Sequence, residues 1–204
     1  MAESRRAELA EHVGHAEGLS AKQSAKSVSR AIDRMVWYAG WTDKIAQVFG
    51  GANPVAGPFF NFSIPNPSGV VAVIASQDSS FESFVDEVLA PICVGNCVVV
   101  VASQHRPTPS VLLGEMTATS DFPAGVLNIV TGVTSELAPT LASHEDVDGI
   151  DLAGLDVVLA NELHAVAAGS IKRVFRPNEH DTASTTRRLR AFIETSTVWH
   201  TIGQ

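Results

Sequence analysis

The chain has few basic residues, few cysteines and no long apolar run, and each shortage excludes a class of protein. Lys and Arg number 14 against 22 Asp and Glu, so a net charge of −8 leaves no basic field to attract nucleic acid or anionic lipid. Only Cys93 and Cys97 are present and no apolar run opens the chain, which indicates a reduced, cytoplasmic protein rather than a secreted disulfide scaffold. The longest apolar runs, residues 69–75 and 97–102, are far shorter than the roughly 20 residues of a membrane-spanning helix. We therefore expect neither a nucleic acid nor a membrane as partner.

What remains is the composition of a globular chain. With 204 residues, of which 45% are hydrophobic and 18% charged, the sequence predicts one domain, or one domain with an appendage. Residues 1–30 are rich in Ala, Glu, Arg, Lys and Ser, which predicts a solvated helix or a loose tail. From Ala31 to Phe49 large apolar side chains recur at helical spacing, which predicts a core helix. A turn-rich connection then leads to a predicted strand over residues 59–64.

Residues 70–175 alternate short β-branched runs with longer helical stretches. Strands are predicted over residues 70–74, 97–101, 126–130, 147–152 and 171–175, and helices over residues 81–92, 110–119, 135–143 and 157–168. Residues 98–101 show no alternation of apolar and polar side chains, which is typical of strands covered by helices on both faces. We predict an α/β fold with a Rossmann-like, mostly parallel sheet and helices on both of its faces.

The last part of the chain predicts a linker, a short helix and a strand. Residues 176–186 are polar and contain Pro177, and residues 187–193 form a short basic helix before a strand over residues 195–201. That strand must pair with another one, because an isolated strand leaves its backbone groups unpaired. The predicted organisation is an N-terminal segment 1–30, a domain 31–175, a linker 176–186 and a C-terminal helix and strand 187–204.

Several phrases, taken in order, carry a family resemblance. They are WYAGWTDKI (residues 37–45), PSGVVAVI (67–74), GNCVV (95–99), FPAGVLNIVTG (122–132) and, after LASH (141–144), VDGI (147–150). Over residues 31–175 the chain resembles the cofactor-binding domain of the NAD(P)-dependent aldehyde dehydrogenase superfamily. The ending LRAFIETSTV (189–198) is similar to that family's last strand, which joins a neighbouring subunit. By the same resemblance, the family's catalytic domain is missing between Val174 and Leu189.

The resemblance implies no catalytic residue in this chain. The family's nucleophilic cysteine follows a Gly-Gln pair, and the only such pair here is Gly203-Gln204. Asp78 stands where the family has an asparagine that donates to the oxyanion, and an ionised carboxylate only accepts hydrogen bonds. The general-base glutamate would fall near Pro177, and Glu179 lacks the glycines that surround that base in the family.

The cofactor residues implied by the resemblance are degraded as well. The ribose-binding Lys-Pro-Ser-Glu phrase reads VASQ (101–104), and Phe-Thr-Gly-Ser reads LAGL (152–155), with Leu159 in place of a later glycine. The degenerate candidates that remain are Ile74, Ser76, Ser103, Gly132 and Gly154. We therefore expect no cofactor, or NAD or NADP bound only weakly, since glycines also serve tight turns.

Other polar groups have simpler interpretations. Cys93 and Cys97 lack a metal-binding spacing and are interpreted as small buried hydrophobes. His12 and His15 are interpreted as part of a solvated helix face, and no metal site is predicted. The acidic cluster straddles a predicted strand and is interpreted as mainly solvated; its members are Asp146, Asp148, Asp151 and Asp156.

Three functional hypotheses follow. The leading one is a catalytically inactive family member that acts in assembly, as a homo-oligomer or together with a full-length aldehyde dehydrogenase. Residues 59–64 and 195–201 would then form a β-arm that adds strands to the neighbour's sheet. The alternatives are a regulatory module that binds an adenine nucleotide weakly, and a residual aldehyde oxidoreductase, for which the sequence supplies no nucleophile.

Overall fold

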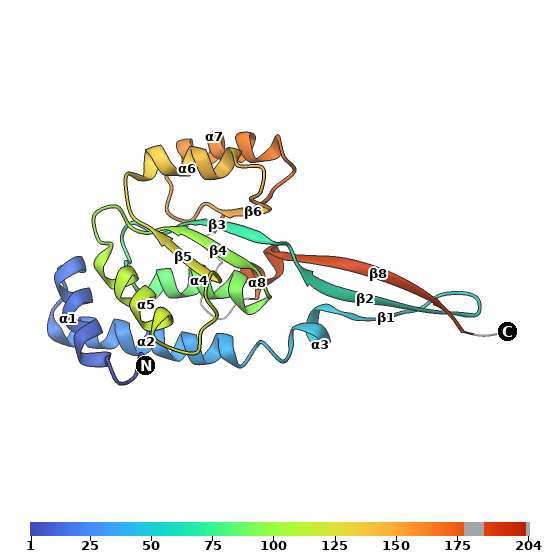
Figure 1. The fold of residues 1–204 in the computed structure, drawn as a ribbon, viewed down its shortest axis with the longest axis horizontal. Helices are drawn as coiled ribbons and strands as arrows, with labels where there is room; N and C mark the ends of the chain where they lie inside the picture. The colour runs from blue at the N-terminus through green and yellow to red at the C-terminus, as the bar shows by residue number, and fades with distance from the viewer. Residues whose placement is uncertain (178–185, 203–204) are drawn as a thin grey trace.

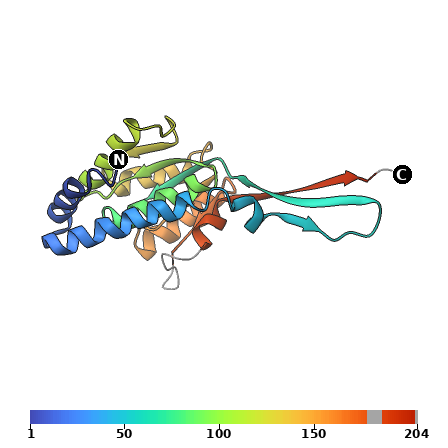
Figure 2. The ribbon, with the colours of Figure 1, turned by 90° about the horizontal axis from the view of Figure 1, so that it is seen from below.

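The computed structural model describes residues 1–177 and 186–202, and it contains two separate β-sheets (Figure 1). One is a five-stranded parallel sheet with helices on both faces. The other is a three-stranded antiparallel sheet that projects from the body as an arm (Figure 2). The prediction of an α/β, Rossmann-like fold is confirmed. Most of the predicted linker, including Glu179, lies outside the described residues.

The central sheet has the strand order β5-β4-β3-β6-β7. Its strands are β3 (Val70–Ile74), β4 (Cys97–Val101), β5 (Leu127–Val130), β6 (Gly149–Asp151) and β7 (Arg173–Phe175). The chain starts at the middle strand, adds β4 and β5 on one side, and then returns to add β6 and β7 on the other. This reversal beside β3 opens a crevice at the carboxyl ends of β3 and β6, which is where ligands bind in open α/β sheets.

Helices cover both faces of this sheet. On β3, Val71 and Val73 belong to one buried apolar cluster, and Ala72 and Ile74 belong to the other. The first cluster is completed by α4 (Glu82–Cys93), α5 (Thr108–Ala118) and α8 (Arg187–Ala191), and the second by α6 (Thr134–Ser143) and α7 (Val157–Ala168). Burial on both faces explains the absence of alternation in the strand sequences. In residues 1–177 and 186–202, no helix has both the length and the apolar character of a membrane span.

The N-terminal segment is helical rather than a loose tail, and although most of its residues are exposed or partly exposed, a few of them are buried against the body. Helices α1 (Arg6–Glu17) and α2 (Ala21–Ala39) form a second layer outside α4 and α5 (Figure 1). Leu9 and Val13, one turn apart on α1, and Val28 on α2 are fully buried. Helix α2 runs through residue 30 without a break. The few apolar side chains of this segment lie on one side of each helix, and small neighbours allow close packing.

The predicted helix from Ala31 to Phe49 is interrupted. Helix α2 ends at Ala39, and a separate short helix, α3 (Ile45–Phe49), follows. The turn-rich connection after α3 contains a short strand, β1 (Gly51–Asn53), that was not predicted. All three of its residues pair antiparallel with β2 (residues 59–67), so its strand conformation depends on that neighbour.

The arm consists of β1, β2 (Phe59–Pro67) and β8 (Ile193–Thr201). β2 and β8 pair antiparallel over nine residues each, from Phe59 opposite Thr201 to Pro67 opposite Ile193. Strand segments far apart in the sequence therefore build one ribbon, which extends away from the body (Figures 1 and 2). The terminal strand was expected to pair with another strand, and β8 does so within the chain, where one of its edges pairs with β2.

Candidate functional site

A polar cleft of about 350 Å³ lies at the carboxyl ends of β3 and β6. Its lining comes from the loop after β3, the start of α4, the loop after β6 and the N-cap of α7. It comprises Ser76, Gln77, Asp78, Ser79, Ser83, Ala153, Gly154, Leu155 and Asp156. Two of the predicted cofactor residues, Ser76 and Gly154, meet here. This is the position at which a Rossmann-like fold binds a dinucleotide, so each contact can be tested against that role.

Ser76 is engaged by a buried carboxylate. Its backbone N–H donates to Oε2 of Glu87 at 3.0 Å, and its hydroxyl donates to Oε1 of the same carboxylate. Glu87 lies on α4 and is 1% exposed, and burial raises the pKa of its carboxyl group, partly opposed by the nearby Arg188 and by the Ser76 hydrogen bonds. The Ser76 N–H and hydroxyl are therefore engaged by a side chain of the protein itself. Ile74, at the end of β3, is fully buried and contributes to the core.

Two glutamines connect the loops that follow β3, β4 and β5. The Gln77 side chain donates to the Ala75 carbonyl at 2.7 Å and accepts from the Gln104 N–H at 2.9 Å. The Gln104 side chain in turn accepts from the Thr134 N–H, at the start of α6, at 3.1 Å. Ser103 is 1% exposed, and its hydroxyl donates to the Gln77 carbonyl at 3.1 Å. This network places protein side chains where the resemblance implies ribose contacts.

The two glycines serve close packing within the chain. The Gly154 N–H donates to the Ile74 carbonyl at 2.7 Å, and a Cβ at Gly154 would stand 1.9 Å from the Ala75 carbonyl oxygen. A glycine is required there by the approach of two backbones of the protein itself. Gly132 is exposed in the turn before α6, where a Cβ would meet the Leu137 side chain at 2.9 Å.

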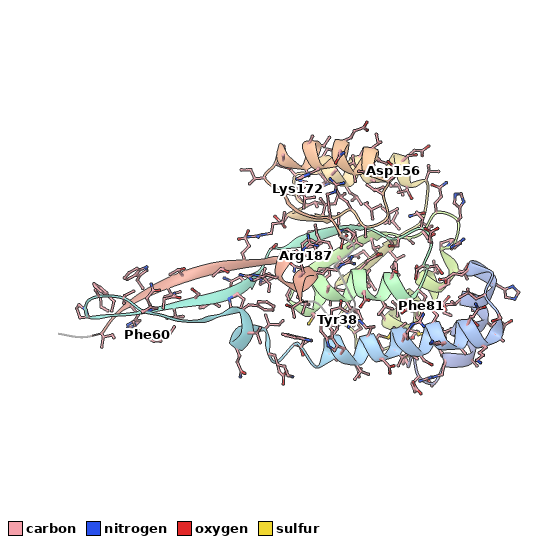
Figure 3. All side chains as sticks on the ribbon, turned by 180° about the vertical axis from the view of Figure 1, so that it is seen from behind. Tyr38, Phe60, Phe81, Asp156, Lys172 and Arg187 are labelled. Carbon is pink, nitrogen blue, oxygen red and sulfur yellow. The ribbon has the colours of Figure 1, made fainter. Side chains whose placement is uncertain are left out.

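The N-terminus of α7 borders the cleft, and the protein's own carboxylate accepts hydrogen bonds from its first N–H groups. Oδ1 of Asp156 accepts from the Val158 N–H at 2.8 Å and from the Leu159 N–H at 3.0 Å (Asp156 is labelled in Figure 3). These are the donors that a phosphate would use. Asp78 lines the same cleft, so a dinucleotide phosphate would face two carboxylates. The residues present do not fit NAD or NADP in the way that the resemblance implies.

Neither cysteine lies at this edge of the sheet. Cys97 begins β4 and Cys93 ends α4, so both lie near the amino ends of the strands, opposite the cleft. The prediction that both are buried is wrong: Cys97 is exposed because it stands at the rim of the sheet, and Cys93 is half-buried. Burial raises the pKa of the Cys93 thiol to about 11, which leaves it protonated at neutral pH. The described residues thus place no thiolate near Asp78.

The acidic cluster is only partly solvated. Asp146, Asp148 and Asp156 are exposed, whereas Asp151 on β6 is fully buried. Oδ2 of Asp151 lies 3.4 Å from Nη1 of Arg188, a residue of α8. The Cζ atom of Arg188 lies 4.9 Å from the centroid of the Phe175 ring. Sequence reasoning missed this pair, although a charge inside the apolar run GIDL was a usable signal. In the described residues no group of histidine, cysteine and carboxylate side chains could hold a metal ion.

The comparisons with known proteins agree with this architecture. The model of the aldehyde dehydrogenase family matches residues 1–176. The chain belongs to the aldehyde dehydrogenase family. It is 33% identical to DhaS of Bacillus subtilis (strain 168) over 144 residues, which are 71% of this chain and 28% of that protein. It is 31% identical to retinal dehydrogenase 2 of Homo sapiens over 138 residues, which are 68% of this chain and 26% of that protein.

The structural comparison agrees with the family match. An NAD-dependent aldehyde dehydrogenase from Sinorhizobium meliloti aligns with a TM-score of 0.80 and 26% identity, over 86% of this chain and 34% of that one. This member of the aldehyde dehydrogenase family thus spans about a quarter to a third of the length of the relatives it matches. The family match includes residues 1–30, in agreement with the packing of Leu9, Val13 and Val28 into the core.

Proposed function

We propose that this aldehyde dehydrogenase-like chain acts in assembly, adding its arm to a neighbouring subunit, and that it does not catalyse aldehyde oxidation by itself. The neighbour is an identical chain or a full-length aldehyde dehydrogenase. The observation that carries the proposal is the outer edge of β8, which faces no other strand in the described residues. Strand addition to such an edge is an established mode of protein recognition.

The surface of the arm supports an interaction role. Phe60 is 48% exposed, Ile64 38% and Trp199 62%, and these side chains belong to a ribbon that extends away from the core. Phe60 on β2 is labelled near the end of the arm in Figure 3. Aromatic side chains are enriched in interfaces because they bury much apolar area with few rotatable bonds.

The carboxyl edge of the sheet supports the second half of the proposal. A dehydrogenase of this family needs a thiolate, an oxyanion donor and a bound dinucleotide. At the cleft, Asp78 stands where an amide donor would be needed, and the Asp156 side chain caps the N-terminus of α7. Ser76 and Ser103 direct their hydroxyls to groups of the protein itself.

Native mass spectrometry tests the proposal directly. The chain would be measured alone and mixed with a full-length aldehyde dehydrogenase from the same source, and an oligomer in at least one sample is expected. Thr197→Lys, which places a charge in the middle of β8, should weaken that oligomer, whereas Thr140→Lys on the exposed side of α6 adds the same charge away from the arm. A chain that remains monomeric in both samples would contradict the proposed assembly role.

A further inference from the structure

A second pocket, of about 670 Å³, lies where the arm joins the body. Its walls come from α3, the start of β7, helix α8 with its N-cap residue, and the first residues of β8. Figure 1 shows α3 and α8 at the base of the arm. Because Arg173 begins β7, the pocket lies toward the amino ends of the strands, opposite the cleft that Ser76 lines. Its volume falls in the range of roughly 300–1,000 Å³ that is typical of sites for small organic molecules.

The polar part of the pocket wall consists of hydrogen-bond donors. Arg173 and Arg190 contribute guanidinium groups, Thr186 and Thr195 contribute hydroxyls, and no described acidic residue lines the pocket. A guanidinium group only donates hydrogen bonds, and a hydroxyl can rotate to donate one. This wall therefore matches a ligand group that only accepts hydrogen bonds, which is the character of an oxyanion.

Positive charge is concentrated around this pocket. Six of the chain's 14 Lys and Arg residues fall within residues 172–190. Four of them are bound to other groups of the protein: Lys172, Arg176, Arg187 and Arg188. The remaining two, Arg173 and Arg190, are the two that line the pocket.

The charges of these two arginines are only partly compensated. Arg173 lies 3.4 Å from Glu194, and the two side chains are 41% and 59% exposed, so this surface pair is weak. Arg190 is exposed, and among the residues that the structure describes its side chain forms no hydrogen bond or ion pair. Arg173, Arg190 and Glu194 together carry one net positive charge, which a single negative charge would balance.

The opposite side of the pocket is apolar. Val48 and Phe49 of α3 and Ile193 at the start of β8 form this side. Phe49 also contacts Trp41, with 6.3 Å between the ring centroids, so its ring is supported from behind. A ligand that fills both halves of the pocket needs an apolar group beside its charged group.

We propose that this pocket binds a small organic carboxylate, with the carboxylate on Arg173 and Arg190 and an apolar group against Phe49. The planar guanidinium fork matches the two oxygens of a carboxylate. A doubly charged phosphate monoester would exceed the single positive charge of the site and would face Glu194. Binding here does not require the arm to pair with a neighbour, and it uses none of the groups at the cleft.

Calorimetric titration of the full chain with benzoate tests the site, and we expect one saturable site. Benzyl alcohol has the ring without the charge and should not bind. Acetate has the charge without the ring and should bind about fivefold more weakly or worse, because it buries no apolar surface on Phe49. Phenyl phosphate should bind more weakly than benzoate.

Three variants test the assigned residues. Arg190→Gln should weaken benzoate binding by about tenfold or more, because a charge-assisted hydrogen bond is lost. Lys22→Gln removes the same charge from an exposed position on α2 and should leave the affinity unchanged. Glu194→Gln should strengthen binding by about two- to fivefold, because the carboxylate of Glu194 no longer competes for Arg173.

Absence of saturable benzoate binding would overturn the inference, as would equal losses of affinity in Arg190→Gln and Lys22→Gln. Tighter binding of phenyl phosphate than of benzoate would contradict the assignment to a carboxylate. Acetate and benzoate affinities that are equal would contradict the role of Phe49. Circular dichroism of each variant confirms that the fold is retained.

Discussion

At the scale of single residues, the main feature is a charge buried where the last helix meets the sheet. The Arg188 side chain is 15% exposed, and its charge lies near two buried carboxylates, Asp151 and Glu87. A buried charge is tolerated only when others compensate it, because removal from water is costly. Arg188 therefore joins α8, and the β8 strand that follows it, to strand β6 and helix α4.

Replacing Arg188 by alanine should reduce the free energy of unfolding by about 3–5 kcal/mol, because it leaves buried carboxylates without their cation. Urea unfolding measures the change. Arg190→Ala is the matched control, since Arg190 lies on the same helix and is exposed, and it should change the value by less than about 0.5 kcal/mol. Equal effects of the two substitutions would contradict the assigned role of Arg188.

The buried Glu87 makes stability depend on pH in a defined direction. Burial raises the pKa of this carboxyl in the folded state above its ordinary value of 4.5, so the folded protein binds the proton more tightly than the unfolded chain does. Stability contributed by the neutral form is therefore present below that value and is lost as pH rises through the folded-state pKa. Glu87→Gln, which keeps the neutral shape, should become more stable relative to wild type as pH rises. Urea unfolding from pH 4.5 upward checks this, and a difference independent of pH would contradict it.

At the scale of elements, α1 and α2 are part of the core although their composition suggested a solvated segment. The Ser20 side chain begins α2 with a capping box, in which it pairs with Gln23, a local signal that the sequence does contain. What the sequence did not reveal was the surface that buries Leu9 and Val13. That surface is formed by α2 and α5, and α5 lies about a hundred residues later in the chain.

Leu9→Ala should lower the free energy of unfolding by about 2–5 kcal/mol, because it removes a fully buried side chain and leaves a cavity. Val36→Ala on α2 is the control, since Val36 is 67% exposed, and it should change the value by no more than about 0.5 kcal/mol. Thermal or urea unfolding measures both. A negligible effect of Leu9→Ala would mean that α1 is not part of the cooperative fold.

At the scale of the whole molecule, the cofactor edge of the fold is assembled from several elements but filled by the protein's own groups. Loops after three strands are held by Gln77 and Gln104, and the start of α7 is capped by Asp156. The strands and helices thus keep the Rossmann-like arrangement, but the groups at the cofactor position form hydrogen bonds with the protein itself. The fold alone does not establish nucleotide binding.

Calorimetric titration of the wild-type chain with NAD, NADP, ADP and AMP should give heats indistinguishable from dilution, because phosphate would meet the carboxylates of Asp78 and Asp156. Asp156→Ser keeps a good helix cap and removes one charge, so any nucleotide affinity should be higher in this variant than in wild type. Saturable binding of NAD to the wild type would favour the nucleotide-binding alternative over the present assignment of the cleft.

The sequence by itself determined the α/β class, most strand and helix positions and the family. β-branched runs and helical periodicity are local, and the phrases from WYAGWTDKI to VDGI match in order. Only the tertiary structure decided the rest: burial of α1, the strand β1, the pairing of Arg188 with Asp151, and the engagement of Ser76 by Glu87. Each depends on contacts between different helices, strands and loops, which no local pattern encodes. The few basic residues and cysteines likewise differ in their roles by position, because only the fold shows that Arg188 is mostly buried and Cys97 exposed.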